Sequence, residues 1–156
     1  MKVDSARTSD GIPLSDWEAI KELSAKCANA VSDNFEDKKF SDLRKKMLRR
    51  LNRLSIKYGE KPSIFATKAD YVISNKNREN LLKSAFYLAE KMHDYKNMTL
   101  ISSSLAEFYV EDIGDLENGK KWLDCLGVSL SKYPDQMEQR VYERIKNIID
   151  LQSMDN

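Results

Sequence analysis

The sequence is poor in the residues that form turns and in those that do most catalytic chemistry. It has 5 glycines and 3 prolines among 156 residues, too few for an all-β fold with its many hairpins. Its two cysteines, Cys27 and Cys125, cannot make a disulfide scaffold, and we expect both to be reduced thiols within helices. Its single histidine, His93, has no second histidine or cysteine at metal-ligand spacing. These shortages exclude a disulfide-rich domain and favour a helical one.

Long apolar segments are also missing. No apolar run approaches the roughly 20 residues that a membrane-spanning helix needs. Residues 1–14 are polar and lack the apolar region of about 7–15 residues found in a signal peptide. We therefore expect a cytoplasmic protein whose residues 1–14 form a flexible N-terminal tail.

Charge is abundant but unevenly distributed. Charged residues make up 33% of the chain, and the net charge is +1. Residues 37–61 carry 10 basic and 3 acidic side chains, whereas residues 104–156 carry 6 basic and 11 acidic ones. Such an asymmetry can steer charged partners.

The apolar residues follow a helical period through nearly the whole chain. They recur every three or four positions, and no run alternates as a half-buried strand would. This pattern predicts an all-α fold of about seven helices in a single domain, residues 15–156. Within it we expect an N-terminal helix pair (15–58), two hairpins (62–133) and a C-terminal capping helix (134–152).

Local signals set the expected helix ends. Residues 15–18 form a capping box that starts the first helix, and Ser41 caps the second. Gly59 ends the second helix, and polar turns follow at residues 75–77, at 93–94 and at 114–115. The apolar stripe of the first helix comprises Trp17, Ile20, Leu23, Cys27, Val31 and Phe35. The stripe of the last helix comprises Met137, Val141, Ile145 and Ile148.

The two central hairpins repeat each other. The spacing of Leu81, Ala85 and Leu88 recurs 38 residues later at Gly119, Leu123 and Leu126. Phe65, Ala69 and Val72 likewise match Ile101, Leu105 and Phe108 at a period of 36.

This repeat resembles the tetratricopeptide-type helical repeat. The residues that carry the resemblance are Leu105, Ala106, Tyr109, Gly114, Asp115, Gly119 and Pro134. Both periods exceed the 34 residues of that family, and residues 75–77 lack its Gly-Asp turn. The resemblance implies stacked antiparallel hairpins with a concave face that binds a peptide or a protein.

No motif for catalysis is present. The chain lacks a glycine-rich phosphate loop, a serine nucleophile elbow and a His-Glu zinc motif. The acidic stretch 111–117 lacks the alternating ligands of a calcium loop. We therefore expect no enzymatic activity, no cofactor and no metal.

An acidic surface with aromatic side chains is the first candidate for partner binding. We expect Tyr87, Tyr109 and Trp122 to be partly exposed. The acidic residues near them in the sequence are Glu107, Glu111, Asp112, Asp115 and Glu117. Aromatic anchors inside an acidic rim would suit a basic protein.

The second helix offers a basic alternative. Lys45, Arg49, Arg53 and Lys57 could contact nucleic-acid phosphates, although no aromatic residues for base stacking lie among them. The acidic first helix could instead lie beside this helix and neutralise it.

We therefore expect a protein-binding helical module. In size and style it is similar to the immunity proteins that neutralise bacterial toxins, which implies a cytoplasmic inhibitor that occludes a cognate toxin, such as a basic nuclease. A peptide-binding adaptor and nucleic-acid binding through the basic helix are the alternatives.

Overall fold

The computed structural model describes residues 6–33 and 38–155, and within them it is all-helical, as predicted. It contains seven α-helices, one short π-helix and no strand in these residues. In chain order they are α1 (Leu14–Asp33), α2 (Lys38–Tyr58), α3 (Pro62–Ala69), α4 (Asn75–Lys91), α5 (Tyr95–Glu107), the π-helix η1 (Phe108–Ile113), α6 (Leu116–Lys132) and α7 (Gln136–Met154).

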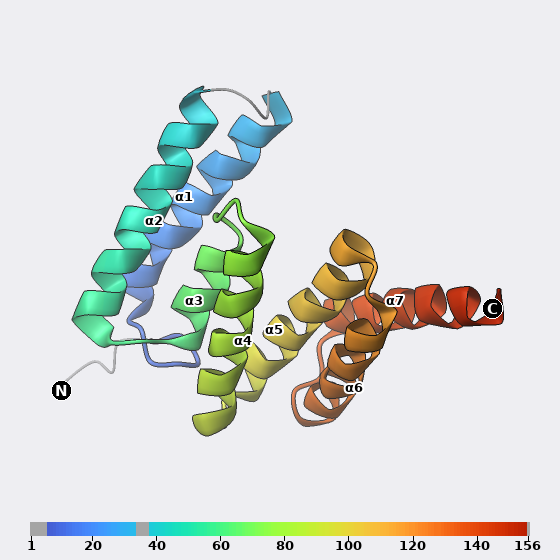
Figure 1. Ribbon diagram of the computed structural model, residues 1–156. Coiled ribbons are helices and arrows are strands. Elements are labelled where there is room, and N and C mark those ends of the chain that lie inside the picture. Colours follow the sequence, from blue (N-terminus) through green and yellow to red (C-terminus); the bar gives the residue numbers. More distant parts are fainter. Residues whose placement is uncertain (1–5, 34–37, 156) are drawn as a thin grey trace.

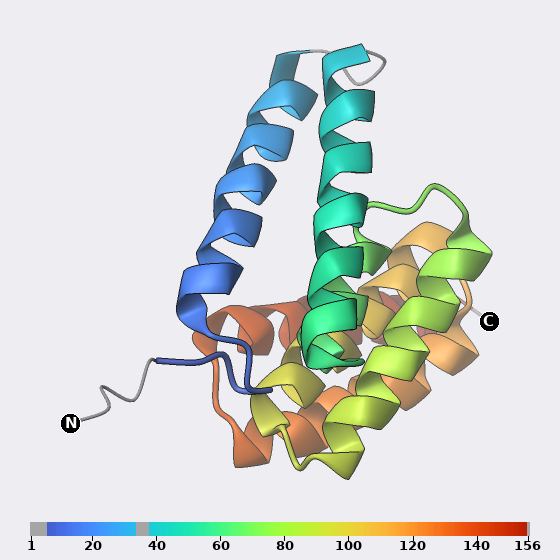
Figure 2. The same ribbon diagram turned by 90° about the vertical axis from the view of Figure 1, so that its left-hand side faces the viewer.

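The helices form a row in which each packs against its neighbours along the chain. α1 and α2 make a long antiparallel hairpin at one end, and α7 lies at the other end (Figure 1). The upper half of this hairpin extends beyond α3–α6, which is clearest in Figure 2. A large part of the α2 surface is therefore left uncovered by other helices.

Three linked apolar clusters form the core. The first joins α1, α2 and α3 around Met47 and Leu51, both fully buried. The second joins α3, α4 and α5, and the third joins α5, η1, α6 and α7 around Ile145. Since α3 and α5 each belong to two clusters, they connect the N-terminal hairpin to the rest of the fold.

Most predicted core positions are confirmed, with one clear exception. Ile20, Leu23 and Cys27 are buried and Trp17 is half-buried, whereas the side chain of Val31 and the whole of Phe35 lie outside the described residues. Met137 was predicted to belong to the stripe of the last helix, but it is 74% exposed. That prediction is wrong because Met137, the second residue of α7, faces solvent in the first turn of the helix.

Several predicted helix boundaries are wrong by a few residues. α1 begins at Leu14, and the carbonyl of Pro13 accepts hydrogen bonds from the amides of Asp16 and Trp17, so Ser15 lies inside the helix instead of capping it. α2 begins at Lys38, before the predicted cap Ser41. Residues 75–77 are the first turn of α4, not a turn between helices, because Ser74 accepts a hydrogen bond from the amide of Asn77.

The predicted turn between α5 and α6 is confirmed and shows why the chain reverses there. Gly114 ends η1 with a φ of +77°, a left-handed conformation that side chains disfavour. Asp115 then caps α6 by accepting hydrogen bonds from both the amide and the side-chain nitrogen of Asn118. These hydrogen bonds lower the pKa of the Asp115 carboxyl.

Gly119 lies where α6 crosses η1, as its assignment to a helix crossing predicted. A Cβ atom at this position would lie 2.3 Å from Cγ2 of Val110, well inside van der Waals contact. Only a glycine therefore allows α6 to approach η1 this closely.

The N-terminal segment is not a flexible tail over its described residues. Ile12 and Asp10 are almost fully buried, at 0% and 1% exposure. Asp10 accepts a hydrogen bond of 2.7 Å from the amide of Ser63, at the start of α3, and Ser9 donates to Asp94, which caps α5. The segment is held in place because Asp10 accepts from an amide at the N-terminus of α3, and because Ser9 bonds to the side chains of Asp94 and Asn97 at the start of α5.

Candidate functional site

The three aromatic residues of the predicted acidic surface have different environments. Tyr87, on α4, is 54% exposed as predicted, and the ammonium of Lys91 lies 4.5 Å from the centre of its ring. Trp122, on α6, is partly exposed and packs edge-on against Phe86. Tyr109 is 5% exposed, so the prediction that it is partly exposed is wrong.

Tyr109 is buried because its ring packs in the second core cluster, and its hydroxyl belongs to a polar cluster between α4 and η1. Its hydroxyl donates to the carboxylate of Glu79, which also accepts a 2.7 Å hydrogen bond from Lys83. The bonds from Lys83 and Tyr109 hold the pKa of Glu79 at about 2. This cluster ties two helices together and offers no binding surface.

The acidic residues near these aromatics are already engaged within the molecule. Glu107 and Glu111 both accept hydrogen bonds from Arg144 on α7, at 3.0 and 2.9 Å. Asp112 pairs with Arg78 on α4 at 3.0 Å, and Asp115 caps α6.

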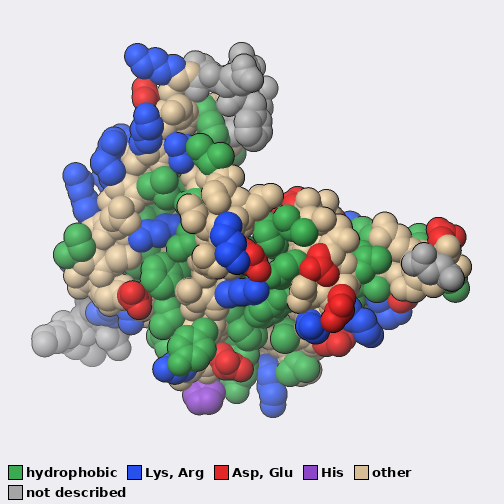
Figure 3. Space-filling view, viewed as in Figure 1, with side chains coloured by type: hydrophobic (Ala, Val, Ile, Leu, Met, Phe, Trp, Pro, Cys, Tyr) green, Lys and Arg blue, Asp and Glu red, His purple; other side chains and the backbone are tan. Residues whose placement is uncertain are grey.

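Glu117 completes this set. It pairs with Lys121 at 3.4 Å, and both side chains are largely exposed. Figure 3 accordingly shows red and blue side chains mixed over the α6–α7 end of the molecule, with no continuous acidic patch on this face. The structure therefore brings these acidic residues to one end of the fold but leaves little uncompensated negative charge there.

The basic residues of α2 are in the opposite situation. Lys45, Arg49 and Arg53 are exposed, and none of them has an ion-pair partner among the described residues. The same holds for Lys46 and for the half-buried Arg50. In Figure 3, blue side chains follow the outer edge of α2. This row is the largest group of uncompensated charge that we find in the described part of the chain.

Lys57 differs from the other predicted residues of the basic patch. It pairs with Asp16 of α1 at 2.9 Å, and Asp16 also accepts a hydrogen bond from Tyr58. The bonds from Tyr58 and Lys57 lower the pKa of the Asp16 carboxyl. The expected neutralisation of α2 by α1 is thus limited, in the described residues, to this one pair.

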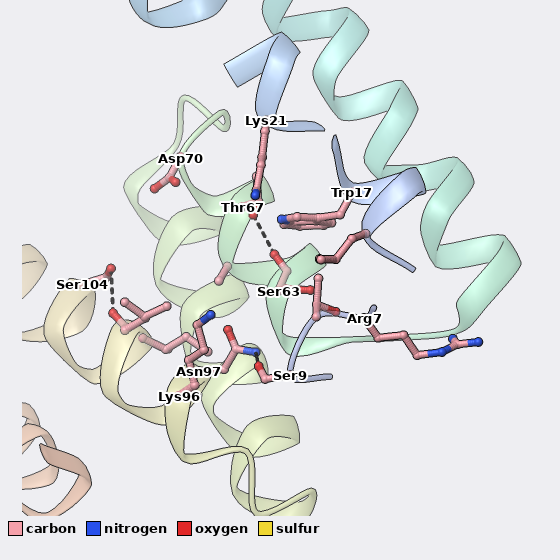
Figure 4. A pocket seen from close by; sticks show the side chains of 15 residues that line it. Arg7, Ser9, Trp17, Lys21, Ser63, Thr67, Asp70, Lys96, Asn97 and Ser104 are labelled. Carbon is pink, nitrogen blue, oxygen red and sulfur yellow. Dashed lines mark hydrogen bonds between the residues drawn. The ribbon is translucent and has the colours of Figure 1, made fainter. Parts of the chain in front are cut away.

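A cleft of about 560 Å³ lies between the N-terminal segment, α1, α3 and α5 (Figure 4). Its wall includes the half-buried indole of Trp17, the buried amide of Asn97 and the hydroxyls of Ser63 and Thr67. The Oγ atom of Ser63 is buried and has no hydrogen-bond partner in the described structure.

No sequence pattern predicted this cleft. Its residues come from four segments between positions 7 and 104, and they share no motif or spacing. One indication could have been found: Asp10 and Asp94 are short acidic side chains beside the predicted helix starts, and such residues are typical of helix caps. These two residues hold the N-terminal segment against α3 and α5.

No group of three or more potential metal ligands is present in residues 6–33 and 38–155. None of the helices described here has the length and apolar character needed to cross a membrane. No family model matches the chain, and no curated protein or solved structure matches it significantly.

Proposed function

We propose that this chain is a helical binding module that docks an acidic surface of a partner protein onto the exposed face of α2. The proposal is supported by one observation, the contrast in charge pairing between α2 and the acidic residues at the other end of the fold. Lys45, Lys46, Arg49, Arg50 and Arg53 have no ion-pair partner in the described residues, whereas the acidic residues at the other end of the fold are engaged by the protein itself.

The shape of the molecule supports this surface. Since α2 runs along the projecting hairpin, a partner can approach its outer face without displacing another helix (Figure 2). Ile56, on the same side of α2 as Lys45 and Arg49, is 87% exposed. An apolar side chain beside a row of cations can add contact area to an interface whose charges speed association.

This proposal changes the expected chemistry of the partner. The acidic residues around Tyr109 and Trp122 predicted a basic partner, and their pairing within the molecule removes the support for that prediction. The narrower proposal of a cytoplasmic immunity protein remains, with a toxin whose contact surface is acidic. The turn at Gly114 and the contact at Gly119 support a tetratricopeptide-like hairpin formed by α5 and α6.

Charge reversal on α2 tests the proposal. The tagged chain is used to capture partners from a lysate of its own host, alongside a variant with Lys45, Arg49 and Arg53 changed to Glu. A matched control changes Lys120, Lys132 and Arg140 to Glu, three exposed cations of α6 and α7. We expect one stoichiometric protein partner that resists nuclease, is lost with the α2 variant and is retained with the control. Retention by both variants would show that α2 is not the binding face.

Nucleic-acid binding is the second candidate, favoured by the same row of cations. Each phosphate contact would add a salt-dependent term to the affinity. Partner recovery that disappears after nuclease treatment would select this candidate. Inhibition of the purified protein partner's activity by a stoichiometric amount of the chain would support the toxin-neutralising role.

A further inference from the structure

The cleft beside the N-terminal segment has the size and construction of a small-molecule site. Its volume of about 560 Å³ falls within the range of about 300–1,000 Å³ seen for ligand pockets. Its walls come from three helices and the N-terminal segment, which is fixed in place by hydrogen bonds at both Ser9 and Asp10. The cleft is therefore a property of the tertiary fold and not a gap between exposed loops.

Hydrogen-bond donors converge on this cleft. Lys21 of α1 and Lys96 of α5 point into it from opposite sides in Figure 4, and the indole nitrogen of Trp17 lies between them. Lys96 has no ion-pair partner in the described residues, and Lys21 has a single exposed contact of 3.9 Å with Glu18. No acceptor for the Trp17 N–H is found in the same part of the chain.

The remaining charged groups limit what the cleft can hold. Asp70 lies at its margin, whereas the side chain of Arg7 points away and donates to the carbonyl of Gly11. The carboxylates of Asp10 and Asp94 lie behind the wall and accept hydrogen bonds from the N-termini of α3 and α5. With Asp70 at the margin, a compact anionic group is favoured over an extended polyanion.

We propose that this cleft binds a small organic anion. Its carboxylate or phosphate group accepts hydrogen bonds from Lys96 and Lys21, and its aromatic body packs against Trp17 and the apolar side chains of Leu14 and Leu100. These two leucines line the cleft and are 39% and 38% exposed, so their side chains are accessible to a ligand. The site is separate from the α2 face, and the proposal does not depend on the proposed function.

Phenyl phosphate is a suitable probe because it joins a compact anion to one aromatic ring. The chain has two tryptophans, so a nitrogen–proton correlation spectrum contains two indole signals, which a Trp122→Phe variant assigns. We expect the Trp17 signal to shift saturably with phenyl phosphate and the Trp122 signal to stay in place. Inorganic phosphate should bind at least about tenfold more weakly because it lacks the ring.

Matched variants make the result decisive. Lys96→Gln and Lys21→Gln should each weaken phenyl phosphate binding about tenfold or more, since each removes a charged hydrogen bond. Lys120→Gln, on the exposed face of α6, should leave binding unchanged. If the indole signal of Trp17 did not shift with phenyl phosphate up to about 10 mM, the proposal would be overturned, because a ligand of this size that fits a site binds more tightly than that. If the Lys96→Gln and Lys21→Gln variants bound phenyl phosphate as tightly as the natural chain, the proposal would be overturned as well.

Discussion

Replacing Gly119 by alanine tests the close contact between α6 and η1. The new Cβ would lie 2.3 Å from Cγ2 of Val110, a separation that two carbon atoms do not tolerate. Val110 is 6% exposed and packed in the third core cluster, so it has little room to move. We therefore expect Gly119→Ala to destabilise the protein.

The magnitude follows from two opposing terms. Overpacking a well-packed core costs about 1–3 kcal/mol, and a contact this short belongs in the upper half of that range. Alanine regains about 1 kcal/mol over glycine inside a helix. The net loss in the free energy of unfolding is then about 1–2 kcal/mol, which corresponds to a decrease in Tm of about 2–8 °C for a chain of this length.

Urea unfolding followed by circular dichroism measures this loss, and a double-mutant cycle assigns it. In a Val110→Ala background the opposing methyl group is gone, so Gly119→Ala should cost at least about 1 kcal/mol less than in the natural chain. Gly127→Ala is the matched control on the same helix. Its Cβ would lie 3.3 Å from the half-buried ring of Tyr142, a far milder contact than the one at Gly119. Because alanine also has the higher helix propensity, Gly127→Ala should leave the free energy of unfolding equal or slightly higher.

Two results would refute this reasoning. The first is a Gly119→Ala variant as stable as the natural chain. The second is an equal cost of Gly119→Ala with and without the Val110 methyl groups, which would show that the contact in η1 is not the cause.

Three further predictions follow from contacts described above. Glu79→Gln should reduce the free energy of unfolding in urea at pH 7 by about 1–3 kcal/mol, chiefly through the charged bond to Lys83. Because the folded pKa of Glu79 is about 2, this difference should be complete above pH 5 and disappear as the pH falls from about 4.5 towards 2. Gly114→Ala should lower the thermal stability by about 1–2 kcal/mol, since its φ of +77° disfavours a side chain. Asp10→Ala should cost about 1–3 kcal/mol in chemical denaturation by leaving the part-buried amide of Ser63 without its partner.

Each of these has a contradicting outcome. A Glu79→Gln difference that stays constant from pH 7 to pH 3 would mean that the charge of Glu79 contributes nothing. Gly114→Asn, which tolerates the left-handed conformation better than alanine, should be less destabilising than Gly114→Ala; the reverse order would contradict the explanation. An Asp10→Ala variant of natural stability would mean that the N-terminal segment does not cap α3.

The helical architecture could be predicted because its signals are local. The three-to-four-residue period of the apolar residues predicts the helices, and Gly114 with Asp115 predicts the reversal between α5 and α6. Gly119 was recognised as a helix-crossing residue from its place in the repeat, and Val110 supplies the physical reason. These features depend on neighbours a few residues away, so a sequence pattern contains them.

The candidate surfaces were harder to predict because charge compensation depends on distant residues. Arg144 neutralises Glu107 and Glu111 from more than 30 positions away, and no local pattern indicates that pairing. Tyr109 was misplaced for a similar reason, since its partner Glu79 lies 30 residues earlier in the chain. The cleft was missed because its donors meet only after α1, α3 and α5 have packed.

The hydrogen bonds of Ser9 have a consequence for the order in which the protein folds. They join it to Asp94 and Asn97, across 85 and 88 residues of chain, whereas adjacent helices form contacts over short loops. Loop-closure entropy opposes such distant pairings until the intervening helices are in place. We therefore expect the helical hairpins to form first and the N-terminal segment to close last. The same segment should be the first to detach in native-state hydrogen exchange, where the amides of Thr8 and Ile12 would lose protection well below the free energy of global unfolding.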